Sequence, residues 1–201
     1  MMNIKQNYLK HAIVLFLLLL LMQPGRAWAA YENIEFSSLT NHDGLTNSQV
    51  GAILKDTRGY IWFGTQSGLC RFDGFRMKTF YYSNTDDKSL PNNSVDELQQ
   101  DYDGNIWVHT SVGYSIYKYD AEQFDRKPEE WLKSIHVQGP PFKLLIDKDK
   151  NMWIAVYGQG LYYHNAKTRN TYLFKFTKKA QKGCLKEGNI SKITEVDGDA
   201  L

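Results

Sequence analysis

Three aspartates recur along this chain at nearly constant spacing, and each is followed six residues later by a tryptophan. The pairs are Asp56 with Trp62, Asp101 with Trp107, and Asp147 with Trp153. A carboxylate can act as a catalytic acid or base, but it can also accept hydrogen bonds from backbone N–H groups across a tight turn. Because each pair lies in the same block of turn and apolar strand, we interpret the three aspartates as structural rather than catalytic.

The other residue types that could support catalysis or metal binding form no recognisable pattern. The five histidines lie in unrelated contexts, and none is paired with a nucleophile motif. Residues 147–151 imitate the opening of a calcium loop, but the sixth position is Met152 instead of Gly and the twelfth is Gly158 instead of Glu. We therefore expect no catalytic residue, no metal and no cofactor, and the ligand-binding residues stay unassigned.

The elements that hold the three pairs form a repeat with steps of 45 and 46 residues. Each copy has a turn before the tryptophan, a strand that carries it, and a second turn that ends in glycine. The turn glycines are Gly59 and Gly104 before the tryptophan, and Gly68, Gly113 and Gly160 after it. A period of this length, with a tryptophan-bearing strand between two turns, is the signature of propeller blades.

The repeat predicts an all-β fold, a partial β-propeller of four-stranded blades, with residues 30–201 as its domain. The blades are expected near residues 45–82, 90–125 and 136–176, with the start of another near 190–201. In that last copy Asp197 occupies the aspartate position, and the matching tryptophan would fall just beyond the last residue. The run Ile61-Trp62-Phe63 is apolar on both faces, so each tryptophan is expected to wedge between adjacent blades.

The first 29 residues predict a secretory signal peptide in helical form. Two lysines precede an apolar run over residues 12–22, which is too short for a comfortable membrane span. Ala27 and Ala29 fit the small-x-small rule, so cleavage is expected between Ala29 and Ala30. An uncleaved anchor is the alternative.

Charge and cysteine placement argue against a nucleic-acid partner and against a disulfide. Three of the 24 basic residues and no acidic residue lie in the signal peptide, which leaves 21 basic against 22 acidic residues after cleavage. A net charge near zero gives no basis for nucleic-acid binding.

Four lysines between residues 178 and 186 form a basic stretch, which a solvated loop between blades explains better than an anion site. Cys70 and Cys184 are separated by two blades, so no bridge between them is expected.

Two features depart from the repeat in ways that could serve recognition. His109 and Ala155 stand where the first copy has Gly64, near the end of the strand; such departures can line a binding face, although ordinary variation between blades also explains them. The segment 131–142 is expected to be an extended connection, and long loops on a rigid scaffold are where recognition is often placed. Three aromatic side chains could stack on sugar rings, namely Trp131, Tyr157 and Tyr162. Burial between strands is nevertheless expected for each of them.

The first copy resembles a known repeat. Its pattern from Asp56 to Phe72, Asp-x-x-Gly-x-Ile-Trp-Phe-Gly-Thr-x-x-Gly-Leu-x-x-Phe, resembles the two-component regulator propeller repeat. Residues 36–50 resemble the start of the periplasmic sensor domain of hybrid two-component regulators. The resemblance covers about residues 31–201. It weakens in the second and third copies, which depart from the pattern at His109, Tyr114, Lys150, Ala155 and Val156.

In that family two seven-bladed propellers and a β-sandwich precede a membrane span, a histidine kinase, a receiver and a DNA-binding region. The resemblance therefore implies a periplasmic sensor of oligosaccharides, within a membrane-anchored and dimeric parent protein that controls polysaccharide-utilisation genes. The sequence contains none of the signalling segments, so we expect a truncated fragment of such a sensor, without enzymatic activity.

A fragment of a secreted propeller enzyme, a glycosidase or polysaccharide lyase, is the alternative function. It would require convergent Arg, His or paired carboxylates at strand ends, and no such set recurs in the sequence. Three blades cannot close a seven-bladed ring, so exposed sheet edges are expected to favour self-association. We also expect the chain alone to bind its sugar weakly or not at all, because propeller sites gather loops from several blades.

Overall fold

A computed structural model of the chain describes residues 37–177, 185–186 and 190–195. The chain divides into two compact units, Met1–Ser37 and Ser38–Leu201, and all the described helices and strands belong to the second unit. The predicted signal peptide, its cleavage site between Ala29 and Ala30, Cys184 and Asp197 lie outside the described residues.

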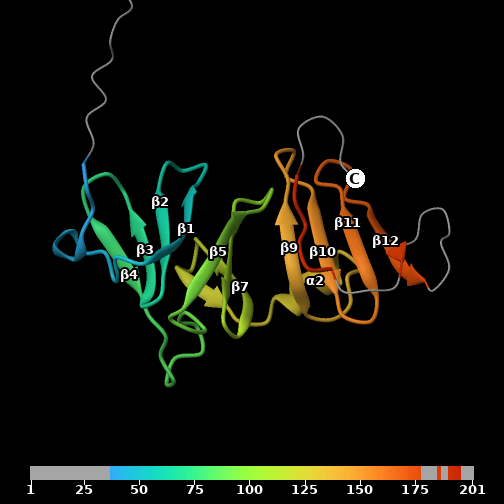
Figure 1. Ribbon diagram of the computed structural model, residues 1–201, viewed down its shortest axis with the longest axis horizontal. Helices are drawn as coiled ribbons and strands as arrows, with labels where there is room; N and C mark the ends of the chain where they lie inside the picture. The colour runs from blue at the N-terminus through green and yellow to red at the C-terminus, as the bar shows by residue number, and fades with distance from the viewer. Residues whose placement is uncertain (1–36, 178–184, 187–189, 196–201) are drawn as a thin grey trace, which may run out of the picture. The chain divides into compact units, whose positions relative to one another are not determined.

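Three sheets follow one another along the second unit, antiparallel except for one short edge strand, and within each sheet neighbouring strands are consecutive in the chain (Figure 1). Blade one consists of β1 (Val50–Lys55), β2 (Ile61–Thr65), β3 (Gly68–Phe72) and β4 (Met77–Phe80). Blade two consists of β5 (Val95–Gln100), β6 (Ile106–Thr110), β7 (Gly113–Lys118) and β8 (Gln123–Asp125). Blade three consists of β9 (Pro141–Ile146), β10 (Met152–Val156), β11 (Gly160–His164) and β12 (Thr171–Thr177). This arrangement confirms the predicted all-β, partial propeller of four-stranded blades.

Blade three carries one strand more than the repeat predicts. The short strand β13 (Leu185–Lys186) pairs with β12 in the parallel direction, with Leu185 opposite Phe176. Residues 190–195 contain no strand, although they belong to the segment where a fourth blade is predicted to start. That fourth blade therefore stays a prediction.

The connection between blades two and three differs from the extended segment expected over residues 131–142. Its first part is a helix, α2 (Pro128–Ser134), and a single 3-10 turn, η1 (Asn41–Asp43), lies before β1. Pro128 suits the first helical turn because a backbone N–H at that position would have no acceptor within the helix. Two glutamates follow it, near the positive end of the helix dipole. Leu132 is fully buried beneath the helix, so packing holds this short element in place.

Two hydrophobic cores lie between the blades. The first joins Trp62 and Leu69 of blade one to side chains of blade two, and the Trp62 ring centroid lies 5.1 Å from that of Tyr117. The second joins Trp107 of blade two to Ile154 of blade three, together with side chains of the α2 connection. Trp62 and Trp107 thus lie between adjacent sheets, as the apolar strands predict.

A third, smaller core covers the other face of blade one. Leu45, from the segment before β1, packs with Phe63 and Cys70 of the sheet. The Thr46 N–H points at the Cys70 sulfur at 3.4 Å, and Cys70 is a free, buried thiol. The chain before the first strand therefore closes the face that no blade covers in the described residues.

Candidate functional site

The repeated aspartates accept hydrogen bonds from their own turns, and the first two are buried. Asp56 accepts the Trp62 indole N–H at 2.7 Å and the backbone N–H groups of Arg58 and Tyr60 at 2.9 and 3.0 Å. Asp101 accepts the Trp107 indole N–H at 3.0 Å in the same way. These carboxylates are fully engaged in holding the turn and the tryptophan, which is a structural role.

The third pair is looser than the first two. Asp147 accepts the Trp153 indole N–H at 3.2 Å, and both residues are half-buried. Its other oxygen accepts the backbone N–H of Asn151 at 2.8 Å, so this carboxylate also serves its turn. Within the described ranges, no group of three or more His, Cys, Asp or Glu side chains is arranged to hold a metal ion.

The predicted turn glycines adopt backbone angles that other residues rarely reach. The values of φ are 90° at Gly59, 83° at Gly104, 134° at Gly68, 115° at Gly113 and 140° at Gly160. At Gly160 an added Cβ would lie 2.2 Å from the Phe174 carbonyl oxygen, so only glycine fits there. The third copy has Lys150 at its first turn, at a φ of 66°, instead of a glycine.

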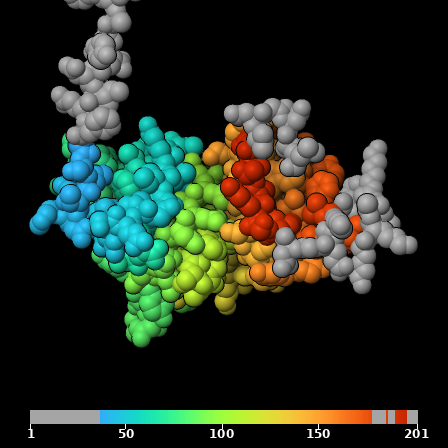
Figure 2. Space-filling view, in the orientation of Figure 1, coloured from blue at the N-terminus to red at the C-terminus, as the bar shows by residue number. Residues whose placement is uncertain are grey.

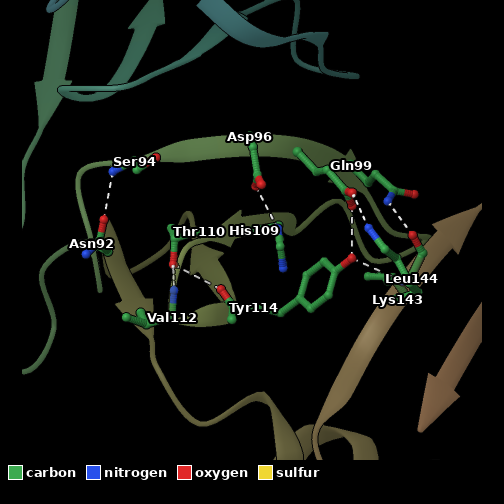
Figure 3. Close-up of polar contacts among 12 residues, drawn as sticks. Asn92, Ser94, Asp96, Gln99, His109, Thr110, Val112, Tyr114, Lys143 and Leu144 are labelled. Atoms are coloured by element: carbon green, nitrogen blue, oxygen red, sulfur yellow. Dashed lines mark hydrogen bonds and ion pairs between the residues drawn. The ribbon is translucent and has the colours of Figure 1, made fainter. Parts of the chain in front are cut away.

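Blades two and three meet through a group of polar side chains, which we call the polar junction (Figure 3). Its members are Asp96, Glu97, Gln99, His109, Tyr114 and Lys143. Glu97 of β5 lies 3.2 Å from the Lys143 ammonium of β9 and accepts the Tyr114 hydroxyl of β7 at 2.9 Å. The carboxylate therefore connects three strands of two blades.

Backbone groups of β9 complete the polar junction. The Gln99 amide donates to the Leu144 carbonyl at 2.8 Å and accepts the Ile146 N–H at 2.5 Å. The Tyr114 hydroxyl accepts the Leu144 N–H at 3.1 Å. Burial and the neighbouring Glu97 carboxylate raise the pKa of Tyr114, so its hydroxyl keeps the proton that it donates.

His109 and Asp96 form the exposed end of the polar junction. The His109 Nδ1 lies 2.6 Å from the Asp96 carboxylate, and its ring centroid lies 4.4 Å from that of Tyr114. A β-bulge in β5 between Val95 and Glu97 turns the strand at Asp96. Among the described residues, no Ser, Thr or Cys side chain hydrogen-bonds to the His109 ring.

A pocket of about 350 Å³ adjoins the polar junction along the first strands of the three blades. Its lining combines apolar and polar side chains, among them Ile53, Glu97, Lys143, Leu145, Ser191 and Lys192. Figure 2 shows residues 190–195, in red, against the orange surface of blade three. We call this hollow the inner-strand pocket.

The sequence singled out His109 of this site but missed Glu97, Gln99 and Lys143. These three side chains lie in ordinary strands, and no motif marks them. A comparison between the copies could have found two of them. Blade one has Ala52 and Leu54 at the positions where blade two has Glu97 and Gln99.

The three aromatic candidates have different surroundings. Tyr162 is buried, as expected, whereas Trp131 lies in α2 instead of between strands and is half-buried against Trp107. Tyr157 is 70% exposed and stacks on Phe142 with centroids 4.1 Å apart, so the expectation of burial was wrong for this residue. Tyr157 follows the last residue of β10 and therefore lies in a turn, outside the sandwiched part of the sheet.

In the part of the chain that the structure describes, none of the helices has the length and apolar character needed to cross a membrane.

Comparison with known proteins identifies the repeat. Residues 44–67 and 89–111 match the family model for the two-component regulator propeller. Histidine kinase P4 of Formosa agariphila is 41% identical over 61 residues, which are 30% of this chain and 4% of that protein. The chain thus spans a small part of this relative.

One solved structure supports the fold, and a second is more distantly similar. The extracellular domain of the putative hybrid two component system BT3049 from B. thetaiotaomicron is 24% identical, with a TM-score of 0.50, over 69% of this chain and 20% of that chain. The extracellular domain of the putative one component system BT4673 from the same organism is 18% identical, with a TM-score of 0.40, over 60% of this chain and 17% of that chain. The two segments matched by the family model contain the pairs Asp56–Trp62 and Asp101–Trp107.

Proposed function

We propose that the chain is part of the ligand-sensing region of a two-component regulator, because residues 44–67 and 89–111 match the two-component regulator propeller model. The proposed ligand is an oligosaccharide, bound in the periplasm. The proposed setting is a membrane-anchored, dimeric regulator, in which this chain takes no part in catalysis.

The inner-strand pocket with the adjoining polar junction is the observation that carries the proposal. The Lys143 ammonium, the Glu97 carboxylate and the Ser191 hydroxyl supply hydrogen-bonding groups of the kinds that bind sugar hydroxyls. Ile53 and Leu145 supply apolar surface for the C–H faces of a sugar ring. A few convergent polar groups among apolar side chains are typical of small-ligand sites.

The position of the site suits a sensor. The Glu97 and Lys143 side chains are each 35% exposed, so a ligand in the pocket can compete for their ion pair. Because these residues come from different blades, a change in their pairing alters the contact between blades two and three. A ligand that binds one arrangement of the blades more tightly shifts the population toward that arrangement.

A glycan-cleaving enzyme is the alternative, and the lining of the pocket does not favour it. Glycosidases use two carboxyl groups about 5–9.5 Å apart across the scissile bond. Among the described residues that line the inner-strand pocket, Glu97 is the single carboxylate, and it is already engaged by Lys143 and Tyr114. Release of reducing ends from a glycan panel by the chain would favour the enzyme instead.

A titration with neutral and acidic oligosaccharides, followed by backbone amide NMR, tests the proposal. We expect at least one oligosaccharide, at concentrations up to about 10 mM, to shift the amide signals of Glu97 and Lys143. Lys143→Gln should weaken this binding by about tenfold, because it removes a charged donor. Lys133→Gln, on the exposed surface of α2, is the matched control and should leave it unchanged.

Two results would refute this function. One is that no oligosaccharide in the panel shifts any signal from the lining of the inner-strand pocket. The other is that the Lys133 control weakens binding as much as Lys143→Gln, since this would indicate a nonspecific attraction between charges.

A further inference from the structure

A second hollow lies between the connection that follows α2 and the outer strands of blade three. It has a volume of about 520 Å³, and we call it the insert groove. Its lining includes His136, Gln138, Gln159, Tyr162, Thr171 and Lys175. It shares no lining residue with the inner-strand pocket, so the two hollows can be tested separately.

The connecting segment that forms one wall of the insert groove is fastened to the blade. The Thr171 hydroxyl donates to the Ile135 carbonyl at 2.6 Å, and the Gln159 amide donates to the Gln138 carbonyl at 2.8 Å. The Tyr162 hydroxyl in turn donates to the Gln159 side chain. These bonds hold the segment at both ends, so a ligand would meet a wall that is already formed.

A buried histidine extends this fastening to blade two. His164 is fully buried, with Nδ1 2.8 Å from the Thr171 hydroxyl and Nε2 3.2 Å from the Tyr102 hydroxyl. Because Thr171 gives its proton to the Ile135 carbonyl, its oxygen accepts the proton on Nδ1 of His164, and Nε2 accepts from Tyr102. A chain of hydrogen bonds therefore runs from blade two to the wall of the groove.

The charge in the insert groove has one sign. Lys175 and His136 present exposed nitrogen groups, and no Asp or Glu is among the described residues that line the hollow. In the described part of the chain neither side chain makes a hydrogen bond or an ion pair, so their donors are available to a ligand. An ammonium without a carboxylate partner, in a preformed hollow, attracts an anionic group.

We propose that the insert groove binds the carboxylate or sulfate group of an acidic sugar residue. Lys175 and the His136 ring donate to the anionic group, and the Gln138 amide donates to a neighbouring hydroxyl. The inference rests on the proposed function only in taking the ligand to be a sugar. It assigns the acidic group to a site apart from the inner-strand pocket.

Three monosaccharides serve as probes: glucuronate, glucose 6-sulfate and glucose, titrated into the full chain at up to about 10 mM and followed by amide NMR. We expect the two acidic sugars to shift the signals of Gln138, Gln159 and Lys175, and glucose to bind at least about tenfold more weakly. Added salt should weaken the binding of the acidic sugars, because the charges are exposed. Glucuronate and glucose 6-sulfate separate the carboxylate from the sulfate as the preferred group.

Substitutions locate the site. Lys175→Gln should reduce binding of the acidic sugars by about tenfold, and His136→Asn should reduce it less. Asn is chosen because it tolerates the φ of 65° at this position. Lys167→Gln, an exposed lysine in the β11–β12 turn, is the control and should have no effect.

The inference is overturned if glucose binds as tightly as glucuronate and glucose 6-sulfate, or if Lys175→Gln changes nothing. It is also overturned if none of the three shifts a signal from the groove. Oligosaccharide shifts confined to the inner-strand pocket would leave the sensor function standing while removing this second site. Loss of shifts at both hollows would remove both proposals.

Discussion

The two junctions between blades share one anchor and differ beside it. In both, a buried aspartate holds a buried tryptophan between the sheets, with indole-to-carboxylate distances of 2.7 and 3.0 Å. Beside that anchor the first and third strands of blade one present Ala52, Leu54 and Leu69 to blade two. Forty-five residues on, the equivalent positions of blade two are Glu97, Gln99 and Tyr114, which bind blade three through charges and hydrogen bonds. An ion pair also joins blades one and two, but it lies further along the sheet, between Arg71 and Glu122 at 3.0 Å.

The two junctions also differ at the position of Gly64. At Gly64 an added Cβ would lie 2.7 Å from a Val95 side-chain carbon, so the first junction is packed too closely for a larger residue. Blade two has His109 at this position, and its ring binds Asp96 instead. Positions that the blade architecture does not fix thus vary between copies. In this chain the polar variants gather at one junction, beside the inner-strand pocket.

The largest expected effect tests the shared anchor. Trp62→Ala should lower the free energy of unfolding by about 3–5 kcal/mol, because it opens a cavity in the first inter-blade core. Trp107→Ala should cost about as much in the second core. Trp153 is half-buried, and its described ring partners, Tyr163 and Phe174, belong to its own blade, so Trp153→Ala should cost about 1–2 kcal/mol.

Urea unfolding followed by circular dichroism measures the three tryptophan variants. Equal losses for Trp62→Ala and Trp153→Ala would contradict the view that a tryptophan depends on the neighbouring blade for most of its stabilisation. A loss below about 1 kcal/mol for Trp62→Ala would show that the anchor itself is unimportant.

A smaller effect tests the polar junction alone. Tyr114→Phe keeps the ring but removes a hydroxyl that donates to Glu97 and accepts from the Leu144 N–H. We expect a loss of about 1–2 kcal/mol, because these two partners are left without their hydrogen bonds. Tyr157→Phe removes the hydroxyl of an exposed ring and is the control, with no expected change in the urea midpoint. If the two variants have the same midpoint, the junction is held by packing rather than by hydrogen bonds.

The sequence was sufficient to predict the fold because the repeat specifies both the turns and the strands of each blade. The spacing of Asp56, Asp101 and Asp147 placed each turn, and the apolar runs around the tryptophans placed the strands between sheets. The sequence was less informative about the connection after blade two. There the chain forms a seven-residue helix, which is too short to be stable alone. Burial of its Leu132 side chain in the core holds it in place.

The site was only partly predictable for a similar reason. His109 stood out because it replaces a glycine, whereas Lys143 and Glu97 lie 46 residues apart in the chain and meet only once two blades are packed. The insert groove depends on contacts between the connection and β12, such as that of Thr171 with Ile135. Such contacts follow from tertiary packing, and no local pattern reports them.

The smallest effect concerns the buried histidine that links blade two, blade three and the connection. Burial, and to a lesser extent the nearby Arg169, lowers the pKa of His164 in the folded chain. In the unfolded chain its pKa returns to about 6.5. As the pH falls through that value toward the lower folded pKa, the unfolded state takes up the proton first, so stability is lost. Full stability from this group is present above about pH 6.5.

Thermal unfolding between pH 7.5 and 5.5 measures this effect. Carboxylates with lowered pKa values in the described residues, such as Glu122, lose their contribution below this window, so they do not mask it. We expect the melting temperature of the original chain to fall across the window, and that of His164→Gln to fall less, because glutamine has no proton to take up. The variant should start from a lower melting temperature, since glutamine does not reproduce both bonds, to Thr171 and to Tyr102. An identical pH slope in the two proteins would show that His164 does not couple protonation to the packing of the two blades.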